Sequence, residues 1–267
     1  MATTWTEAPD MARHEPAIHR IGSAEVGQAL ALGWRDFLAN PTQLIFLAIL
    51  YPVIGLVAAQ LAAGREVMPL FWPLVSGFAL LGPVAALGVY ELSRRREQGQ
   101  PTRWTDAIAV RHSPALTSII GLGVLLLAIF VAWIFTARAI YGMTLGDTPA
   151  TATDFLSRVL YSREGHQLML LGNLAGFLFA ALVFSLTVVS FPMLLDRAGR
   201  GLPVSAGMAM RASLRAVRAN PGPLALWGFL IALLLALGSL PLFVGLAVAV
   251  PVLGHATWHL YRRIVRD

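Results

Sequence analysis

The sequence contains no cysteine, and it contains no lysine either, because all 20 of its Lys and Arg residues are arginine. The missing cysteine excludes disulfides, thiolate metal sites, iron–sulfur clusters and cysteine nucleophiles. The missing lysine excludes Schiff-base catalysis and the lysine of a P-loop. The GxSxG and HExxH motifs and the dinucleotide-binding fingerprint are absent as well. We therefore expect a protein that is not an enzyme.

Charge is scarce throughout the 267 residues. Only 13% of them are charged and 57% are hydrophobic, whereas soluble domains carry roughly 25% charged residues. The formal net charge is +6, but the arginines stand at the ends of apolar stretches, where membrane topology explains them better than nucleic acid does. The composition predicts an integral membrane protein whose partner is the lipid bilayer and not nucleic acid.

Several stretches lack Asp, Glu, Arg and Lys over a length that can cross a bilayer, which takes roughly 20 residues of helix. Four of them are single spans, at residues 44–63, 68–90, 116–137 and 168–195. A fifth stretch, 219–260, is long enough for two crossings, with a turn at 238–241. The sequence thus predicts an all-α polytopic membrane protein with six transmembrane helices.

The arginines predict how these helices are oriented. With the N-terminus inside, sixteen arginines fall in cytoplasmic segments and four fall outside, which is the positive-inside pattern. Residues 1–20 form a polar tail without the features of a signal peptide, and 21–267 form a single membrane domain. Both termini are expected in the cytoplasm.

The chain also resembles itself at a fixed offset. Leu92 and Leu194, like Arg95 and Arg197, are 102 positions apart, and a second offset relates Leu92 to Leu260. We interpret this as three pseudo-repeated hairpins, at about 22–96, 99–197 and 201–267. Each hairpin follows a short amphipathic helix on the cytoplasmic side, which lies either in the headgroup layer or against protein.

His255 and His259 are the first candidate site. They are four residues apart in the last span, so a helix places them on one face. Two imidazoles can bind haem or a metal, or relay protons, although they need further ligands. The alternative is that both are interfacial, beside Trp258 and Tyr261 in an aromatic belt.

Other polar residues have structural and functional interpretations. Two hypotheses concern four polar residues in the fourth span. These residues either line a polar path or pack against a neighbouring helix: Asn173, Ser185, Thr187 and Ser190. Interfacial or structural roles are expected for Asn40, Pro41, Asn220, Pro221, Glu91, Arg94 and Arg95.

Three segments carry a resemblance to a known family. They are Gly33-Trp34-Arg35-Asp36-Phe37, Tyr90-Glu91-Leu92-Ser93-Arg94-Arg95 and Gly254-His255-Ala256-Thr257-Trp258-His259-Leu260-Tyr261-Arg262. The chain resembles a bacterial family of predicted integral membrane proteins, domain of unknown function 2189, over about residues 20–265. Some members are labelled cytochrome c oxidase subunit I. Such a subunit has twelve helices and several intramembrane histidines, which this chain lacks. The resemblance implies a multi-pass protein of the bacterial inner membrane.

Three hypotheses about function follow. The first is a non-catalytic accessory, assembly or scaffold component, with a membrane-protein partner or as a homo-oligomer. The second is a small-molecule or lipid transporter, which internal repeats favour. The third is a haem- or metal-binding accessory subunit of a respiratory complex; otherwise no cofactor is expected.

Overall fold

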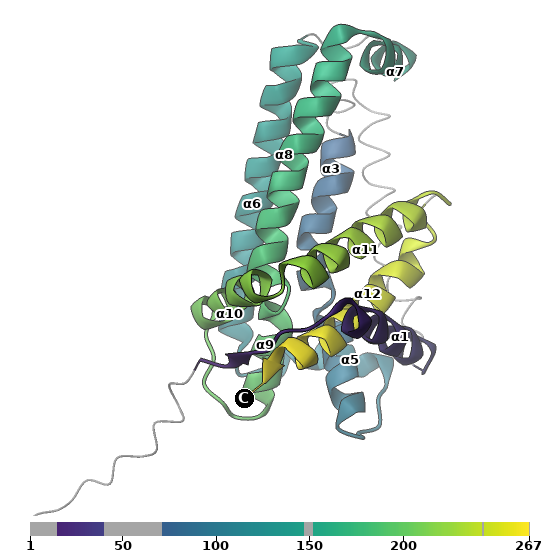
Figure 1. The fold of residues 1–267 in the computed structure, drawn as a ribbon. Coiled ribbons are helices and arrows are strands. Elements are labelled where there is room, and N and C mark those ends of the chain that lie inside the picture. The colour runs from purple at the N-terminus through teal and green to yellow at the C-terminus, as the bar shows by residue number, and fades with distance from the viewer. Residues whose placement is uncertain (1–14, 40–70, 147–151, 242, 267) are drawn as a thin grey trace, which may run out of the picture.

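The computed structural model describes residues 15–39, 71–146, 152–241 and 243–266 (Figure 1). The predicted span 44–63 and the candidate residues Asn40 and Pro41 lie outside these ranges, so those predictions stay predictions.

Two long helices, α6 (Leu116–Thr144) and α8 (Arg163–Thr187), lie side by side and form the tall part of the molecule. Trp133 of α6 joins three elements: its ring packs on Phe179 of α8, and its Nε1 donates to the Pro73 carbonyl at 2.8 Å. Pro73 belongs to α3 (Phe71–Phe78), which runs beside them. The helix α7 (Ala152–Tyr161) packs against α8 at the far end of this bundle.

Four helical stretches of the described residues are long and apolar enough to cross a membrane: Pro73–Glu97, Leu116–Thr144, Arg163–Gly199 and Pro221–Ser239. The first is built in pieces, from α3, η3 (Ala79–Leu81), α4 (Gly82–Ala85) and α5 (Leu87–Glu97). The expectation of an all-α polytopic protein is confirmed, whereas the number six is not. One predicted span lies outside the described residues, and α12 (Leu246–Ile264) is not among the four, because its second half is polar.

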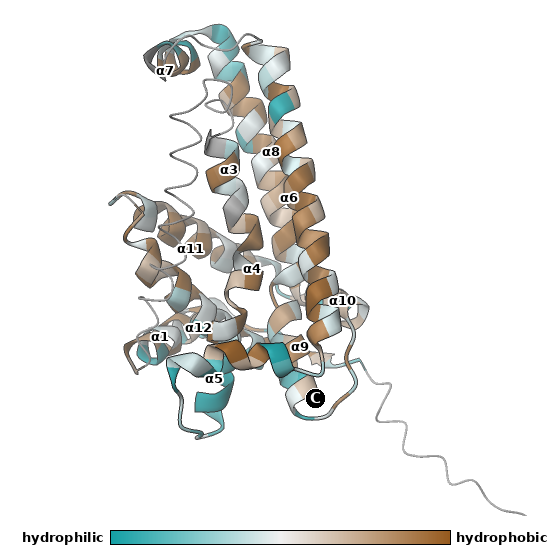
Figure 2. Cartoon of the chain, turned by 180° about the vertical axis from the view of Figure 1, so that it is seen from behind, coloured by the Kyte–Doolittle hydropathy of each residue, from teal (hydrophilic) through white to brown (hydrophobic). Residues whose placement is uncertain are grey.

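The opposite end of the molecule is where four shorter helices meet. They are α1 (Ser23–Ala39), α5, α9 (Ser190–Gly199) and α12, and Figure 2 shows most of the hydrophilic colour in this region. The helices α1 and α12 approach each other closely at Gly33, where an added Cβ would lie 2.5 Å from the Ala256 nitrogen. Glycine at position 33 therefore allows the two helices to pack backbone against backbone.

The remaining elements pack around this end in chain order. The 3-10 helix η4 (Trp104–His112) packs on α5, and α10 (Ala206–Ala219) packs on α9 and leads into α11 (Pro221–Ser239). A two-residue ladder pairs β1 (Ala17–Ile18) with β2 (Val265–Arg266) in antiparallel fashion. Asn220 accepts from the Ile21 nitrogen at 2.7 Å and donates to the His19 carbonyl at 3.0 Å. The segment before α1 is thereby joined both to the end of α12 and to the start of α11.

Candidate functional site

Asp36 is the centre of a buried polar cluster between α1, α5 and α12. Its Oδ2 accepts from Ser93 Oγ and from His259 Nε2, each at 2.8 Å, and its Oδ1 lies 3.0 Å from Arg96 Nε. The residue is only 6% exposed. A buried carboxylate is tolerable when its charge and lone pairs are satisfied in this way.

The hydrogen bonds of Ser93 determine which nitrogen of His255 carries the hydrogen. Ser93 Oγ lies 2.7 Å from His255 Nδ1 and also bonds Asp36. Ser93 has one hydroxyl hydrogen, and an ionised carboxylate can only accept, so that hydrogen goes to Asp36. His255 must then donate from Nδ1–H to Ser93, which leaves Nε2 with its lone pair. Among the described residues Nε2 has no hydrogen-bond partner, and the side chain is fully buried.

Two pKa values support this assignment. Burial lowers the pKa of His255 from 6.5 to about 4, against the opposing effect of the Asp36 charge, so the ring is neutral. For Asp36, burial alone would raise the pKa, but hydrogen bonds from His259 and Ser93 outweigh it and lower the pKa. The carboxyl is therefore ionised, as the hydrogen bonds of Ser93 require.

A second buried carboxylate, Asp196, joins α9 to α12. Its Oδ2 accepts from Tyr261 Oη at 2.7 Å and lies 2.9 Å from Arg200 Nη2 and 3.2 Å from Arg262 Nη1. Arg262 continues the network, because its Nε lies 3.0 Å from Glu97 Oε1. Glu97 also accepts from Trp258 Nε1 at 3.0 Å.

The end of α5, residues 91–97, is the hub of both networks. Glu91 is bonded by Arg94 through two nitrogens and by Arg95 at 2.8 Å. Arg95 also reaches Asp106 at 3.0 Å, which connects the hub to η4. Ser93 and Arg96 bind Asp36 of α1. Glu97 binds Trp258 and Arg262 of α12. Neighbouring residues of α5 therefore bind different helices.

The predicted histidine pair is brought together by the fold, yet each ring is turned to the same carboxylate. His259 Nε2 is 2.8 Å and His255 Nδ1 is 3.9 Å from Asp36 Oδ2. Of the nitrogens just described, only His255 Nε2 keeps a lone pair for a haem or metal. Within the described ranges, no group of three or more His, Asp or Glu residues is arranged to hold a metal ion. Cofactor binding by this pair stays a prediction.

Four residues for which an interfacial or structural role was predicted have partners within the protein. Trp258 and Tyr261 are 0% and 1% exposed. Glu91 and Arg94 pair with each other. These contacts fit the structural alternative, and the interfacial role stays a prediction. Sequence analysis missed Asp36, Ser93, Glu97 and Asp196 as their partners; the only signal was that Asp36 and Ser93 occur in the family motifs.

The residues of the hypothetical polar path differ in burial and in hydrogen bonding. Asn173 is exposed and donates to its own helix, from Nδ2 to the Met169 carbonyl at 2.7 Å. Thr187 and Ser190 are buried and likewise donate to carbonyls four residues earlier. Ser185 is partly buried. The path therefore stays a prediction. Asn173 differs from the other three residues because its side chain is exposed.

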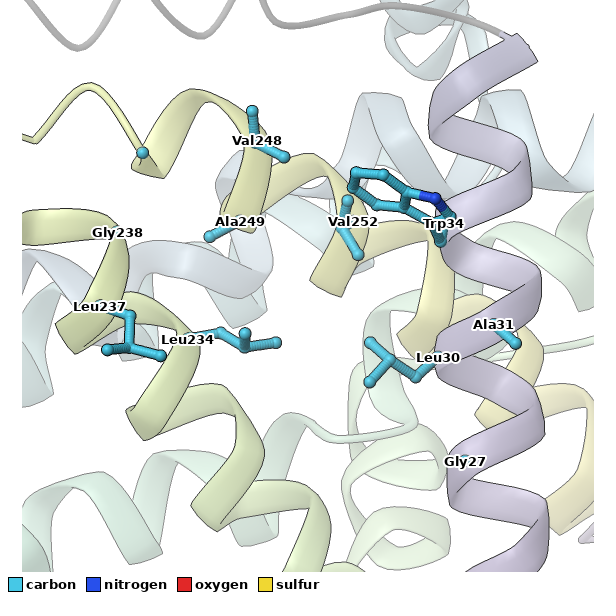
Figure 3. Close-up of a pocket in the computed structure, with 11 residues that line it drawn as sticks. Gly27, Leu30, Ala31, Trp34, Leu234, Leu237, Gly238, Val248, Ala249 and Val252 are labelled. Atoms are coloured by element: carbon cyan, nitrogen blue, oxygen red, sulfur yellow. The ribbon is translucent and has the colours of Figure 1, made fainter.

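An apolar groove of about 640 Å³ lies between α1, α11 and α12 (Figure 3). Leu30 and Trp34 of α1 form one side, and Leu234 and Val252 face them from α11 and α12. The described residues that line it carry no titratable side chain. As described, the groove offers an apolar surface to a ligand.

Apolar spans joined at one end by a buried ion-pair network define the class: a polytopic helical integral membrane protein. Residues 70–196 match the family described as "Predicted integral membrane protein (DUF2189)". The resemblance drawn from the sequence is thereby confirmed over those residues. No curated protein and no solved structure gives a match.

Proposed function

We propose that the protein is a non-catalytic accessory, assembly or scaffold component that binds another transmembrane helix through the outer face of α8. The buried cluster supports a structural use, because Asp36 is engaged with Ser93, His259 and Arg96, and Asp36 does not line the apolar groove described above. The outer face of α8 carries a polar side chain, Asn173, whose hydrogen bond among the described residues stays within its own helix.

The supporting observation is Asn173. It is ten residues from Arg163, the start of α8, and therefore about 15 Å along the helix, at hydrocarbon depth. Its side chain is exposed, and among the described residues its single hydrogen bond is to Met169. An amide with unused hydrogen-bonding groups is costly in lipid and is stabilised by a partner helix.

The surroundings of Asn173 fit such a contact. A Cβ added at Gly172 would meet nothing within 4 Å, so this position is open on the surface and lets another backbone approach. Leu170 and Phe177 flank it and are 70% and 68% exposed. A small residue, an amide and large apolar side chains together form a typical helix-binding face.

The test is purification of the full-length protein from native membranes in mild detergent. We expect the wild type to retain one defined partner or to migrate as a dimer. N173L and G172L should each reduce retention about tenfold, which corresponds to the one or two kcal/mol of an interhelical hydrogen bond or close contact. F229L on α11 is the matched control, because Phe229 is also exposed, at 61%, and lies on another helix.

The outcomes separate partner types. Because the chain has no native cysteine, oxidation of L170C would crosslink two copies if the partner is a second copy, and would leave the chain uncrosslinked if it is another protein. A solitary wild-type monomer, or N173L behaving as the wild type, would contradict the proposal.

The proposal includes three hairpins arranged in a ring in the bacterial inner membrane, with both termini cytoplasmic. The packing supports it: α5 packs on η4, α9 on α10, and the last helix, α12, on the first, α1. The pseudo-equivalent residues Leu92, Leu194 and Leu260 are all buried in the core. Loops join the first hairpin to the second and the second to the third. The β1–β2 ladder would connect the third back to the first by hydrogen bonds instead of a loop.

Lipid handling is a second candidate, and the apolar groove favours it. A bulky substitution at Ala31, which lines the groove, should displace any acyl chain held there. We expect A31F to lower the lipid that co-purifies, measured by mass spectrometry, whereas A24F, at an exposed position of α1 outside the groove, should not. Equal lipid content in wild type and A31F would exclude this function.

A further inference from the structure

The helix α7 lies crosswise at the far end of α6 and α8, opposite the end that holds the buried polar cluster (Figure 1). It has ten residues. The helix before it, α6, and the helix after it, α8, are both long and apolar enough to cross a membrane. A helix in this place lies near the level where two spans leave the bilayer, so the chemistry of its exposed side chains indicates what surrounds it.

The inner side of α7 is joined to both spans. Arg158 Nη2 donates to the carbonyl of Leu145, at the end of α6, at 2.7 Å. A Cβ added at Gly165, in the first turn of α8, would lie 2.6 Å from the Val159 Cα and would collide with the carbonyl oxygen of the same residue. The glycine therefore allows α7 to lie directly on the beginning of α8.

The contact at Gly165 sets the level of α7 relative to the apolar part of α8. Apart from this glycine, residues 163–167 are polar, and the apolar stretch of α8 begins at Leu168. Three residues separate the contact from that stretch, which is about 4.5 Å along the helix axis. The headgroup layer on each side of the hydrocarbon core is roughly 5–7 Å thick. With α8 in the membrane, α7 therefore lies at the level of the headgroups.

The exposed surface of α7 has an apolar side and a polar side. Leu156 and Leu160 are 55% and 43% exposed, and they lie on one face because they are four residues apart. Asp154 and Ser157 are exposed as well, and they share another face because they are three residues apart. Ser157 lies about 100° further around the helix than Leu156. Such a division is typical of helices that lie in the plane of the membrane interface.

We propose that α7 is an interfacial helix that inserts Leu156 and Leu160 into the lipid of the leaflet in which α6 ends and α8 begins, while Ser157 faces headgroups and water. Helices of this kind bury their apolar side roughly 5–10 Å into the boundary between headgroups and acyl chains, and the two leucines reach that boundary from the level of Gly165.

The partner of this surface is the lipid bilayer, and the proposal does not depend on the α8 face at Asn173. It gives α7 a role in holding α8 at a fixed depth. Movement of α8 toward the hydrocarbon would bury the polar side of α7 in lipid, and movement outward would expose its leucines to water. Both displacements are unfavourable.

The experiment places single cysteines in the full-length chain, which has none of its own. L156C and L160C are labelled with a nitroxide and reconstituted in vesicles of phosphatidylethanolamine and phosphatidylglycerol. Collisions of the label with molecular oxygen, which concentrates in lipid, are compared with collisions with a water-soluble nickel chelate. S157C is the matched control on the polar side of the same helix. F135C is the lipid reference, because Phe135 is 69% exposed on α6.

We expect the ratio of oxygen to nickel collisions to be severalfold higher at L156C and L160C than at S157C. It should be lower than at F135C, because Phe135 lies well inside α6 and the headgroup boundary is shallower. Equal ratios at L156C, L160C and S157C would overturn the proposal, because the leucines would then face water. Labels at L156C and L160C that neither reagent reaches would overturn it as well, because protein would then cover this side of α7.

Discussion

Asp36 and His259 are 223 positions apart in the chain, yet Asp36 Oδ2 and His259 Nε2 are 2.8 Å apart in the fold. Asp36 stands near the end of α1 and His259 near the end of α12. Their contact therefore joins the first described helix to the last. Because the same carboxylate also binds Ser93 and Arg96 of α5, one buried charge holds three helices in a fixed arrangement.

Removing that charge should destabilise the whole end of the molecule. D36N would remove a buried anion from the part-buried His259 and from Arg96, whose side chain is 38% exposed, and we expect the free energy of unfolding to fall by about 3 kcal/mol. Unfolding by denaturant in detergent measures it. E25Q on the same helix removes the same charge at a side chain whose one hydrogen bond among the described residues is from the Gly22 nitrogen, and it should change stability by less than about 0.5 kcal/mol. Equal effects of the two variants would show that Asp36 is not central.

His255 predicts a dependence of stability on pH. Its pKa is about 4 in the fold and about 6.5 when unfolded. Between these values the unfolded state binds more protons, so stability should fall as the pH is lowered from about 6.5 to 4, by about 3 kcal/mol in all. The groups that face this ring are Asp36 on α1, Ser93 and Arg96 on α5, and His259 on α12.

H255N removes this titration and keeps a nitrogen donor near Ser93. The slope of stability against pH between 4 and 6.5 should therefore disappear in H255N and persist in H112N, which alters an exposed histidine. Asp36 acts in a lower window: its pKa is lowered in the fold, so its contribution is present above about pH 4 and is lost only in stronger acid. An unchanged slope in H255N would contradict the assignment of a neutral, buried ring.

Two glycines of α1 should respond in opposite directions to the same substitution. G33A would place a Cβ 2.5 Å from the Ala256 nitrogen, so the helices must separate, at a cost of about 2 kcal/mol. G27A meets nothing within 4 Å and should stabilise α1 by roughly 0.5–1 kcal/mol, because alanine favours helix. Thermal unfolding of both variants tests this. A harmless G33A would mean that α1 and α12 do not pack closely.

The proposed orientation can be tested with single cysteines, since the natural chain has none. Gln98 follows α5 and Ser157 lies in α7, and both side chains are exposed. We expect S157C to react in intact spheroplasts with a thiol reagent that cannot cross the membrane, and Q98C to react only after lysis. The reverse pattern would place the termini outside.

The sequence was sufficient for the class of fold but not for the site. Apolar runs predict helices in a membrane because burying a backbone in lipid requires internal hydrogen bonds, and 116–137 and 168–195 fall within α6 and within α8 and α9. The same argument assigned α12 to the membrane, because its first half is apolar. It could not show that the second half finds Asp36, Glu97 and Asp196, since ion pairs depend on distance in space and not along the chain.

The sequence by itself thus determined the membrane environment, the helical class and the family resemblance, since each depends on composition or on local order. Only the tertiary structure decided that Asp36 and His259 form a hydrogen bond. Such a bond acts over about 3 Å, and only folding brings residues 223 positions apart to that distance. It also decided that Asn173 faces outward, which is the arrangement on which the proposed function rests.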